Sequence, residues 1–243
     1  MPATSLIDPA TERVGALVRD AFTEVLGERL DALLVHGSAV TGGYLPGFSD
    51  FDFLVYMHGP LSTDDSSAIQ SRLGPADHAP FAYLQASHII DLDNPASVDQ
   101  RFPLIDGAYA TLVGDYPVGW PFHDANTLRD HGNDFLGDLP SLIARCRRAW
   151  SVATGERRRR EVRYQLTDVK PALRALLVRL GAPALKVWTA PYPELARRWT
   201  THDPVNGPRF ARLLESLPPS EATEASTGTE MLALLDAIAE QSQ

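Results

Sequence analysis

The stretch from residue 33 to residue 57, LLVHGSAVTGGYLPGFSDFDFLVYM, constrains the fold of this chain more than any other. Two continuous apolar runs, at residues 32–36 and 51–57, are typical of strands that are buried on both faces of a sheet. Between these runs lie a Gly-Ser turn, a short helical segment, and a loop rich in glycine and proline. The stretch therefore predicts a strand, a tight turn, a short helix, a loop and a second strand.

Two carboxylates stand at the start of the second predicted strand. Asp50 and Asp52 are two residues apart, and side chains two apart in a strand point to the same face. Paired carboxylates suit a hard divalent cation such as Mg²⁺, which takes oxygen ligands and shares them with phosphates. Gly37 lets the backbone approach a ligand closely, and the helix start at Ser38 offers unpaired N–H groups. This combination predicts metal-assisted chemistry on a nucleoside triphosphate.

These residues resemble the signature of the DNA polymerase β-type nucleotidyltransferase superfamily. That signature is an apolar strand, Gly-Ser, about a dozen residues, and Asp-x-Asp in an apolar strand, and HGSAVTGGYLPGFSDFDFLV carries each part. The resemblance implies that a substrate hydroxyl attacks the α-phosphorus of a nucleoside triphosphate and that pyrophosphate leaves. It implies two Mg²⁺ ions on Asp50, Asp52 and a third carboxylate. It also implies that Gly37 and Ser38 hold the triphosphate.

The third carboxylate is expected on a neighbouring strand, where it binds metal or acts as general base. The candidate strand is FAYLQASHIIDLD, residues 81–93, and we favour Asp91 within it as the third metal ligand and catalytic residue. Asp93, His88 and Gln85 are the alternatives. Histidine serves as a base but is a poor ligand for Mg²⁺.

The rest of the chain divides into two regions of different character. An amphipathic helix is expected over residues 9–29, a helix of about ten residues ending near Gly74, and a third strand over 81–91. Residues 97–113 are expected to be helical and then extended. From about residue 124, helical periodicity predicts helices at 139–153, 156–180, 191–200, 207–216 and 229–241. Pro171 is expected to kink the second of these helices or to mark its start.

The predicted fold class is α+β. We expect an N-terminal nucleotidyltransferase α/β domain with a mixed sheet over residues 1–118, and an all-helical domain over 119–243. The stretch VRYQLTDVKPALRALLVRLGAPALKVW is similar to the helical domain of streptomycin/spectinomycin-type aminoglycoside adenylyltransferases. This resemblance implies that Arg174, or Lys170, and Lys186 reach the triphosphate. The alternative interpretation of Arg174 and Lys186 is a solvated helix face.

Composition excludes several other classes. A formal net charge of -9 does not favour a nucleic-acid partner, and we interpret the run ERRRRE as a solvated helix start. The single cysteine, Cys146, excludes an internal disulfide and is expected to be a small packed residue. The N-terminus lacks a targeting segment and no apolar run is long enough to span a bilayer, which predicts a cytoplasmic protein without a membrane partner. The sequence carries no signal for an oligomeric state.

The predicted function is an Mg²⁺-dependent nucleotidyltransferase. It would transfer a nucleoside monophosphate, AMP from ATP, to a hydroxyl of a small molecule such as an aminoglycoside-like antibiotic. The alternatives are a regulatory, antitoxin-type nucleotidyltransferase that acts on a protein partner, and a degenerate module that binds a nucleotide without turnover. Antitoxin-type proteins are usually much shorter than 243 residues and lack a long helical unit, which argues against the first alternative.

Overall fold

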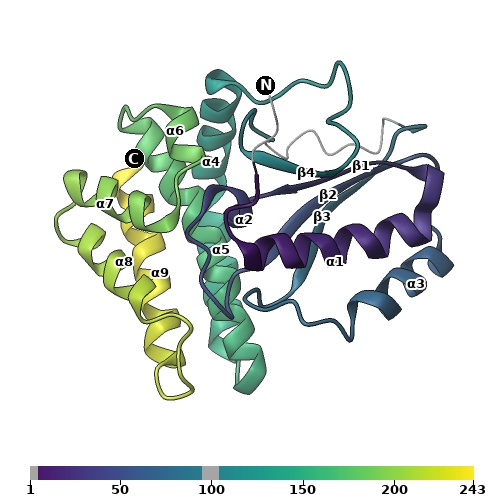
Figure 1. Cartoon of the computed structure of the whole chain (residues 1–243). Coiled ribbons are helices and arrows are strands. Elements are labelled where there is room, and N and C mark those ends of the chain that lie inside the picture. The colour runs from purple at the N-terminus through teal and green to yellow at the C-terminus, as the bar shows by residue number, and fades with distance from the viewer. Residues whose placement is uncertain (1–4, 95–103) are drawn as a thin grey trace. The chain divides into compact units, whose positions relative to one another are not determined.

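The structure is a computed structural model that describes residues 5–94 and 104–243. The chain divides into two compact units, one ending at His123 and the other running from Asp124 to Gln243. The N-terminal unit contains a sheet with helices, and the C-terminal unit is built from helices, as Figure 1 shows. The predicted α+β class is therefore confirmed. Within the described ranges, no helix combines the length and the apolar character needed to cross a membrane.

The N-terminal unit is built on a mixed four-stranded sheet with the strand order β3-β2-β1-β4. These strands are β1 (Leu30–His36), β2 (Phe51–Met57), β3 (Leu84–Asp91) and β4 (Tyr109–Val113). β1 is antiparallel to both β2 and β4, whereas β2 and β3 are parallel. The predicted strands at 32–36 and 51–57 are confirmed. The third strand begins at Leu84 rather than at residue 81, because Phe81 lies in a turn closed by its N–H on the His78 carbonyl.

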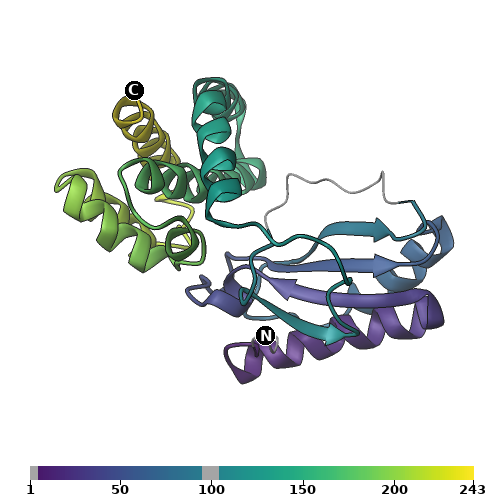
Figure 2. The same cartoon turned by 90° about the horizontal axis from the view of Figure 1, so that it is seen from above.

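One face of the sheet is covered by α1 (Pro9–Leu26) and α3 (Thr63–Leu73). Figure 2 shows α1 lying along this face. Alternate strand residues, among them Leu33, Val35, Phe53 and Val55, pack there against Val14, Val18 and Phe22. α1 begins where the Asp8 carboxylate caps it, and a 3₁₀ turn, η1 (Gly27–Arg29), follows its end. The expected helix over 9–29 is thus an α-helix that ends three residues early.

The other face carries Leu34, Leu54 and Tyr56, and it is covered by an aromatic segment that runs from the first residue of β4 to the end of the unit. The rings of this segment contact one another and Tyr56; they belong to Tyr109, Tyr116, Trp120 and Phe122. Asp52 is on the same side of β2 as Leu54 and Tyr56, because it is separated from each by an even number of residues. The helix expected within 97–113 falls largely on residues outside the described ranges, but its extended end is confirmed as β4.

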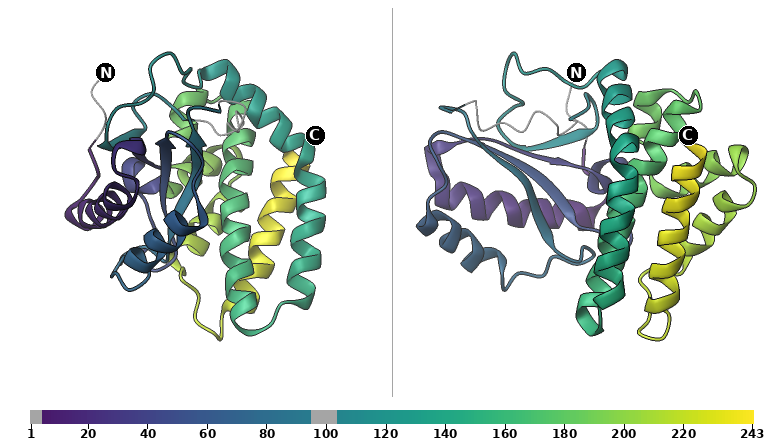
Figure 3. Two further views of the ribbon diagram at one scale, coloured as in Figure 1. Left: turned by 90° about the vertical axis from the view of Figure 1, so that its right-hand side faces the viewer. Right: turned by 180° about the vertical axis from the view of Figure 1, so that it is seen from behind.

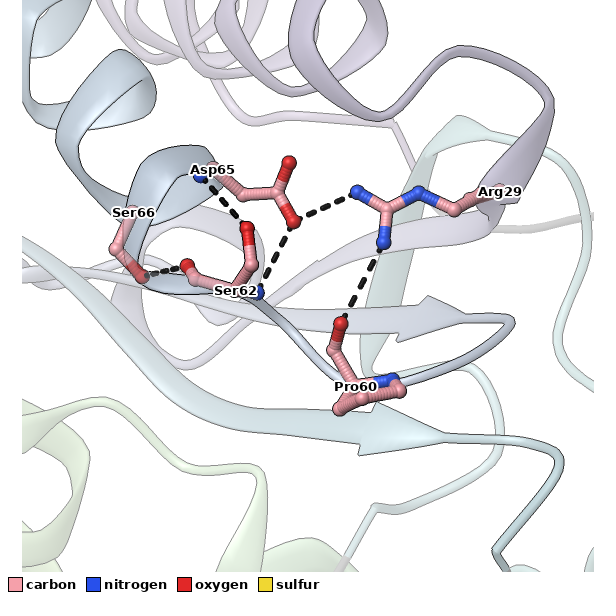
Figure 4. Close-up of polar contacts among 5 residues, drawn as sticks. All are labelled: Arg29, Pro60, Ser62, Asp65 and Ser66. Atoms are coloured by element: carbon pink, nitrogen blue, oxygen red, sulfur yellow. Dashed lines mark hydrogen bonds and ion pairs between the residues drawn. The ribbon is translucent and has the colours of Figure 1, made fainter.

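A polar cluster fixes the start of α3 beside the start of β1 (Figure 4). Ser62 caps α3 and forms a capping box with Asp65, whose carboxylate also lies 2.7 Å from Nη2 of Arg29. Arg29 donates a second hydrogen bond to the Pro60 carbonyl. These contacts lower the pKa of Asp65 to about 2, with the Arg29 hydrogen bond as the largest cause. The cluster is a structural clamp at the opposite end of β2 from the carboxylate pair.

The C-terminal unit contains the long helices α4 (Ala125–Val152), α5 (Gly155–Arg179) and α9 (Glu224–Gln241), which pack together as Figure 3 shows. Three shorter helices complete it; they are α6 (Ala184–Trp188), α7 (Tyr192–His202) and α8 (Asn206–Glu215). Ion pairs join α9 to each of its neighbours through Arg147–Asp236, Arg159–Glu224 and Arg209–Glu230. Cys146 is buried in α4, where burial and the adjacent Asp168 carboxylate raise the pKa of its thiol to about 12.

α4 and α9 begin well before their predicted first residues, whereas α5 matches its predicted range of 156–180 within one residue at each end. α4 begins at Ala125 rather than at 139, because the Asp124 carboxylate caps it and Gly132, Gly137 and Pro140 are accommodated inside it. α5 continues through Pro171 rather than starting there. α9 begins at Glu224, so the polar linker expected before residue 229 is shorter.

Candidate active site

The carboxylate pair lies at the start of β2, next to the Gly-Ser turn that follows β1. Asp50 immediately precedes β2, and Asp52 is its second residue. Gly37 has a φ of 71°, which a residue with a side chain rarely adopts. A Cβ atom at position 37 would lie 3.0 Å from Oδ2 of Asp52, so the turn packs directly on the carboxylate. The structure therefore brings the predicted metal pair and the predicted phosphate turn together.

Ser38 follows the turn as the first residue of α2 (Ser38–Thr41), and it is buried. The turn is closed by the amide N–H groups of Val40 and Thr41, which donate to the Gly37 carbonyl, and by the Thr41 hydroxyl, 2.9 Å from the same oxygen. Because the Gly37 carbonyl is used in this way, its orientation is fixed. The first N–H groups of a helix have no intrahelical partner, so those at the start of α2 are the groups of this turn that are suited to an anion.

Each carboxylate of the pair accepts a hydrogen bond from a hydroxyl on the β3 side of the sheet. The Tyr83 hydroxyl lies 3.0 Å from Oδ2 of Asp50. The Ser87 hydroxyl lies 3.3 Å from Oδ1 of Asp52, and Nε2 of His36 lies 3.2 Å from the same Ser87 oxygen. Burial, with a smaller contribution from His88, lowers the pKa of His36 to about 3. The imidazole of His36 is therefore neutral at physiological pH.

The structure does not bring Asp91 to the pair. Asp91 is opposite Met57 at the far end of β2, five residues beyond Asp52. At about 3.3 Å per residue, this corresponds to about 17 Å along the strand. Asp93 lies at the same far end, where it contacts Nδ1 of His58 at 2.9 Å. The favoured assignment of Asp91 as the third ligand of this site is contradicted by the register of β3. β3 is parallel to β2, and Asp91 is its last residue, so Asp91 lies at the end of the sheet that is far from Asp50 and Asp52.

The residue opposite Asp52 on β3 is Gln85, one of the alternatives that the sequence left open. Opposite residues of paired strands have side chains on the same face, so the exposed Gln85 amide stands beside the carboxylate pair. His88 is opposite Leu54, two residues further along. A glutamine brings an amide oxygen and an N–H₂ group, but it has no negative charge and cannot act as a base.

The donor set fits a divalent cation that shares its shell with phosphates. Mg²⁺ is commonly held by one or two carboxylates together with substrate phosphates, and Asp50 and Asp52 supply two. Across the described part of the chain, no group of three or more His, Cys, Asp and Glu side chains is arranged to hold a metal ion. Two carboxylates and a neutral Gln85 are thus what this edge of the sheet offers to Mg²⁺.

The basic residues predicted to contact the triphosphate lie in the helical unit. Arg174 is on α5, where its guanidinium stacks over the Trp188 ring and donates to the Ala190 carbonyl at 3.1 Å. Burial lowers the pKa of Arg174 to about 10, so it stays charged at neutral pH. Lys170, one turn earlier on α5, lies 4.4 Å from the Tyr192 ring centre. Lys186 is exposed on α6.

Sequence reasoning missed two of the groups that contact the carboxylates. These are the hydroxyls of Tyr83 and Ser87. Ser87 reaches Asp52 because the register of β2 and β3 shifts between Phe53 and Leu54, which leaves Ser87 as an extra residue of β3. A serine in an otherwise ordinary strand gives no signal of such a bulge. The Tyr83 contact depends on where β3 begins, which was misplaced by three residues.

Comparisons with known proteins agree with this geometry. A family model described as the nucleotidyltransferase domain matches residues 19–99, which confirms the superfamily resemblance. The fold is similar to a crystal structure of spectinomycin adenyltransferase AAD(9) from Enterococcus faecialis with ATP and spectinomycin. That similarity has a TM-score of 0.60 at 14% identity and covers 93% of this chain and 98% of the other. At this identity it shows the fold.

One curated protein also matches over a short segment. Serine carboxypeptidase 1 from Hordeum vulgare is 36% identical over 75 residues, which is 30% of this chain. The segment spans 13% of the length of that protein, so the match concerns a small part of it.

Proposed function

We propose, on the premise that residues 19–99 form a nucleotidyltransferase domain, that this protein transfers AMP from ATP to a hydroxyl of a small molecule. The acceptor would be an aminoglycoside-like antibiotic, and pyrophosphate would be released. The observation that carries the proposal is the contact between the Gly37 turn and Asp52, because it places a phosphate-binding turn against a carboxylate pair.

The reaction joins the acceptor oxygen to the α-phosphorus of ATP and breaks the bond from that phosphorus to the oxygen that leaves with pyrophosphate. Asp50 and Asp52 would hold Mg²⁺, which neutralises charge on the attacking and leaving oxygens when it is bound. The Gly37–Ser38 backbone would hold the outgoing phosphates in line. With this division of roles, the protein contributes positioning and charge neutralisation and forms no covalent bond to the substrate.

The helical unit is proposed to neutralise the rest of the triphosphate charge. Arg174 supports this role because its Nε atom is buried and has no hydrogen-bond partner anywhere in the described part of the chain. A buried, incompletely satisfied cation is costly unless an anion compensates it. Lys186, being exposed, is able to reach a ligand without such a cost. We propose ATP as the nucleotide because the structural relative of similar fold was crystallised with ATP.

The acceptor class is proposed from this structural relative as well. The same relative was crystallised with spectinomycin, and its similarity covers the helical unit as well as the nucleotidyltransferase domain. An extended helical unit is more consistent with that two-part arrangement than with a short antitoxin-type protein. The observation that favours a second candidate is Gln85. Because the position across from Asp52 carries no acid, a module that binds a nucleotide without turnover is the competing function.

The decisive experiment measures pyrophosphate release from the purified full chain with Mg²⁺, each of the four nucleoside triphosphates, and a panel of aminoglycosides and aminocyclitols. Release that requires both ATP and a hydroxyl-bearing drug is the expected result, with the adenylylated drug identified by mass spectrometry. Asp50→Asn serves as the inactive control. Tight ATP binding without release for any acceptor would favour the binding module, and label transfer to a co-expressed protein would favour the regulatory enzyme.

A further inference from the structure

The two carboxylates of the site are each held by a hydroxyl group that comes from the same side of the sheet. Tyr83 donates to Asp50 at 3.0 Å, and Ser87 donates to Asp52 at 3.3 Å. Neither hydroxyl has a role in the transfer proposed above. A carboxylate has two acceptor oxygens, so one hydrogen bond from a hydroxyl does not by itself prevent it from binding a cation.

The backbone fixes where these two hydroxyls stand. The Tyr83 carbonyl accepts the Phe51 N–H at 3.0 Å, and the Ala82 N–H donates to the Ser49 carbonyl at 2.8 Å. These two backbone hydrogen bonds attach residues 82 and 83 to Ser49 and Phe51, which are the neighbours of Asp50 in the chain. The position of Tyr83 beside Asp50 is therefore fixed, although β3 begins one residue later. Ser87 is the extra residue between the pairs Phe53–Ala86 and Leu54–His88. A bulge of this kind re-aims one side chain, here toward Asp52.

His36 sets the direction of the Ser87 contact. A serine hydroxyl has a single proton, and when that proton is donated to Asp52 the oxygen can only accept from its other neighbour. That neighbour is Nε2 of His36, at 3.2 Å, so the proton of the neutral imidazole sits on Nε2. The chain of donors therefore runs from His36 to Ser87 to Asp52.

We propose that Tyr83 and Ser87 are positioning residues that hold Asp50 and Asp52 in the orientation that binds a divalent cation. Outer partners of this kind orient the groups that ligate a metal, and losing one of them typically weakens metal binding about 10- to 100-fold. Because Gln85 supplies no third charge, the pair depends on its orientation more than a three-carboxylate site would. The catalytic consequence rests on the proposed function, whereas the effect on cation binding does not.

Two variants remove a hydroxyl and little else. Tyr83→Phe keeps the ring, and Ser87→Ala removes one atom. Ser87→Thr restores a hydroxyl at the same position. The matched controls lie in the same unit and also lose one hydrogen-bonding hydroxyl each: Tyr116→Phe, whose hydroxyl donates to the Pro121 carbonyl, and Ser66→Ala, whose hydroxyl donates to the Ser62 carbonyl. Asp50→Asn reports the complete loss of the pair.

The primary measurement is Mn²⁺ binding to the full chain by electron paramagnetic resonance, with thermal unfolding recorded for every variant. We expect Tyr83→Phe and Ser87→Ala each to raise the Mn²⁺ dissociation constant about 10- to 100-fold. The controls and Ser87→Thr should stay within about 3-fold of the unchanged protein, since they keep the second-sphere hydroxyl at the site. In a transfer assay, the same two variants should raise the Mg²⁺ concentration needed for half-maximal rate more than they lower the rate at saturating Mg²⁺.

The proposal is overturned if both hydroxyl-removing variants keep the Mn²⁺ affinity of the unchanged protein, or if the unchanged protein binds no Mn²⁺ at this pair. It is also overturned if their affinity falls only in proportion to a loss of thermal stability that the controls share, because the role would then be structural. If the expected Mn²⁺ pattern appears while no nucleotide and acceptor release pyrophosphate, this proposal stands and the proposed function fails.

Discussion

Gly37 and Asp52 are in contact across the end of the sheet, and a Cβ atom at position 37 would stand 3.0 Å from the Oδ2 atom of the Asp52 carboxylate. The contact joins the turn after β1 to the second residue of β2. The contact leaves little room for a side chain at position 37. The φ of 71° is a second reason for glycine there, because residues with a side chain rarely adopt it.

Gly37→Ala is expected to reduce nucleotide transfer by up to about 100-fold, because the added methyl group pushes the Asp52 carboxylate by a few tenths of an ångström and a 1 Å misplacement can cost about 100-fold. The control is Gly47→Ala, where φ is 69° and nothing lies within 4 Å of the added Cβ. Both variants carry a similar backbone strain, so a similar loss of stability is expected for both. Equal activities of the two variants would contradict the role assigned to the contact.

Asp52→Asn should abolish divalent-cation binding and lower the transfer rate by at least about 100-fold, because a neutral amide replaces half of the charged donor set. Asp91→Asn is the informative comparison, since Asp91 lies opposite Met57 at the other end of β2. The transfer rate and the Mn²⁺ affinity of Asp91→Asn should match those of the unchanged protein. A loss of cation binding in Asp91→Asn would restore that residue to the site and contradict the strand register.

Gln85→Glu should change stability in opposite directions with and without a divalent cation. Without one, a third negative charge opposite Asp52 is expected to cost roughly 0.2–1 kcal/mol of folding free energy. With Mg²⁺ or Mn²⁺ present, the added carboxylate should raise cation affinity and so produce a larger increase in Tm than in the unchanged protein. Gln70→Glu, an exposed change on α3, controls for the added charge. Differential scanning fluorimetry across a cation titration gives both readings.

His36 should make folding stability fall as the pH is lowered. Its pKa is about 3 in the folded protein, because the side chain is buried, whereas the ordinary value for histidine is 6.5, so the unfolded chain binds the extra proton first. Stability linked to His36 is therefore fully present above pH 6.5 and is lost as the pH falls from 6.5 toward 3. His36→Gln should flatten urea-unfolding free energies across this window, whereas His202→Gln, an exposed change on α7, should not.

Two glycines of the helical unit should respond oppositely to alanine. At Gly228 on α9, a Cβ would lie 2.3 Å from the Trp150 ring of α4, so Gly228→Ala should destabilise the unit by about 1–3 kcal/mol. At Gly137 within α4, nothing lies within 4 Å, so Gly137→Ala should stabilise it by about 0.5–1 kcal/mol through helix propensity. Thermal unfolding, monitored by circular dichroism, distinguishes the expected decrease in stability of Gly228→Ala from the expected increase in stability of Gly137→Ala.

The parts of the fold that sequence reasoning predicted are those with a strong local signal. β1 and β2 are continuous apolar runs, and α3 has its Ser62 cap, so their positions follow from the residues themselves. The carboxylate pair and the Gly37 turn lie inside this well-signalled stretch, and the structure brings them together. α4 is the counterexample. Its glycines and its proline are typical helix breakers, but packing of Leu128, Leu136 and Leu139 outweighs them.

The rest of the site depends on strand pairing, which no local pattern gives. Gln85, rather than Asp91, stands across from Asp52 because of where β3 is aligned along β2. Spacing along the chain cannot give this alignment, since one residue of slip moves every side chain to the other face. The hydroxyls of Tyr83 and Ser87 are set by the same alignment. For this reason the carboxylate pair could be predicted from the sequence, whereas the residues that contact the pair could not.

Because Ser87 is an extra residue in β3, the pairing of β3 with β2 does not require it. Ala86 and His88 are opposite Phe53 and Leu54, which are consecutive in β2. Removing Ser87 altogether would therefore leave every other pair of the two strands where it is, whereas removing a residue near either end of β3 would shift the pairs between that residue and the bulge. A one-residue deletion scan of β3 should accordingly show that deletions are tolerated at the bulge and not near the two ends of the strand, and a protein that lacks Ser87 should fold normally with Asp52 released from its hydroxyl.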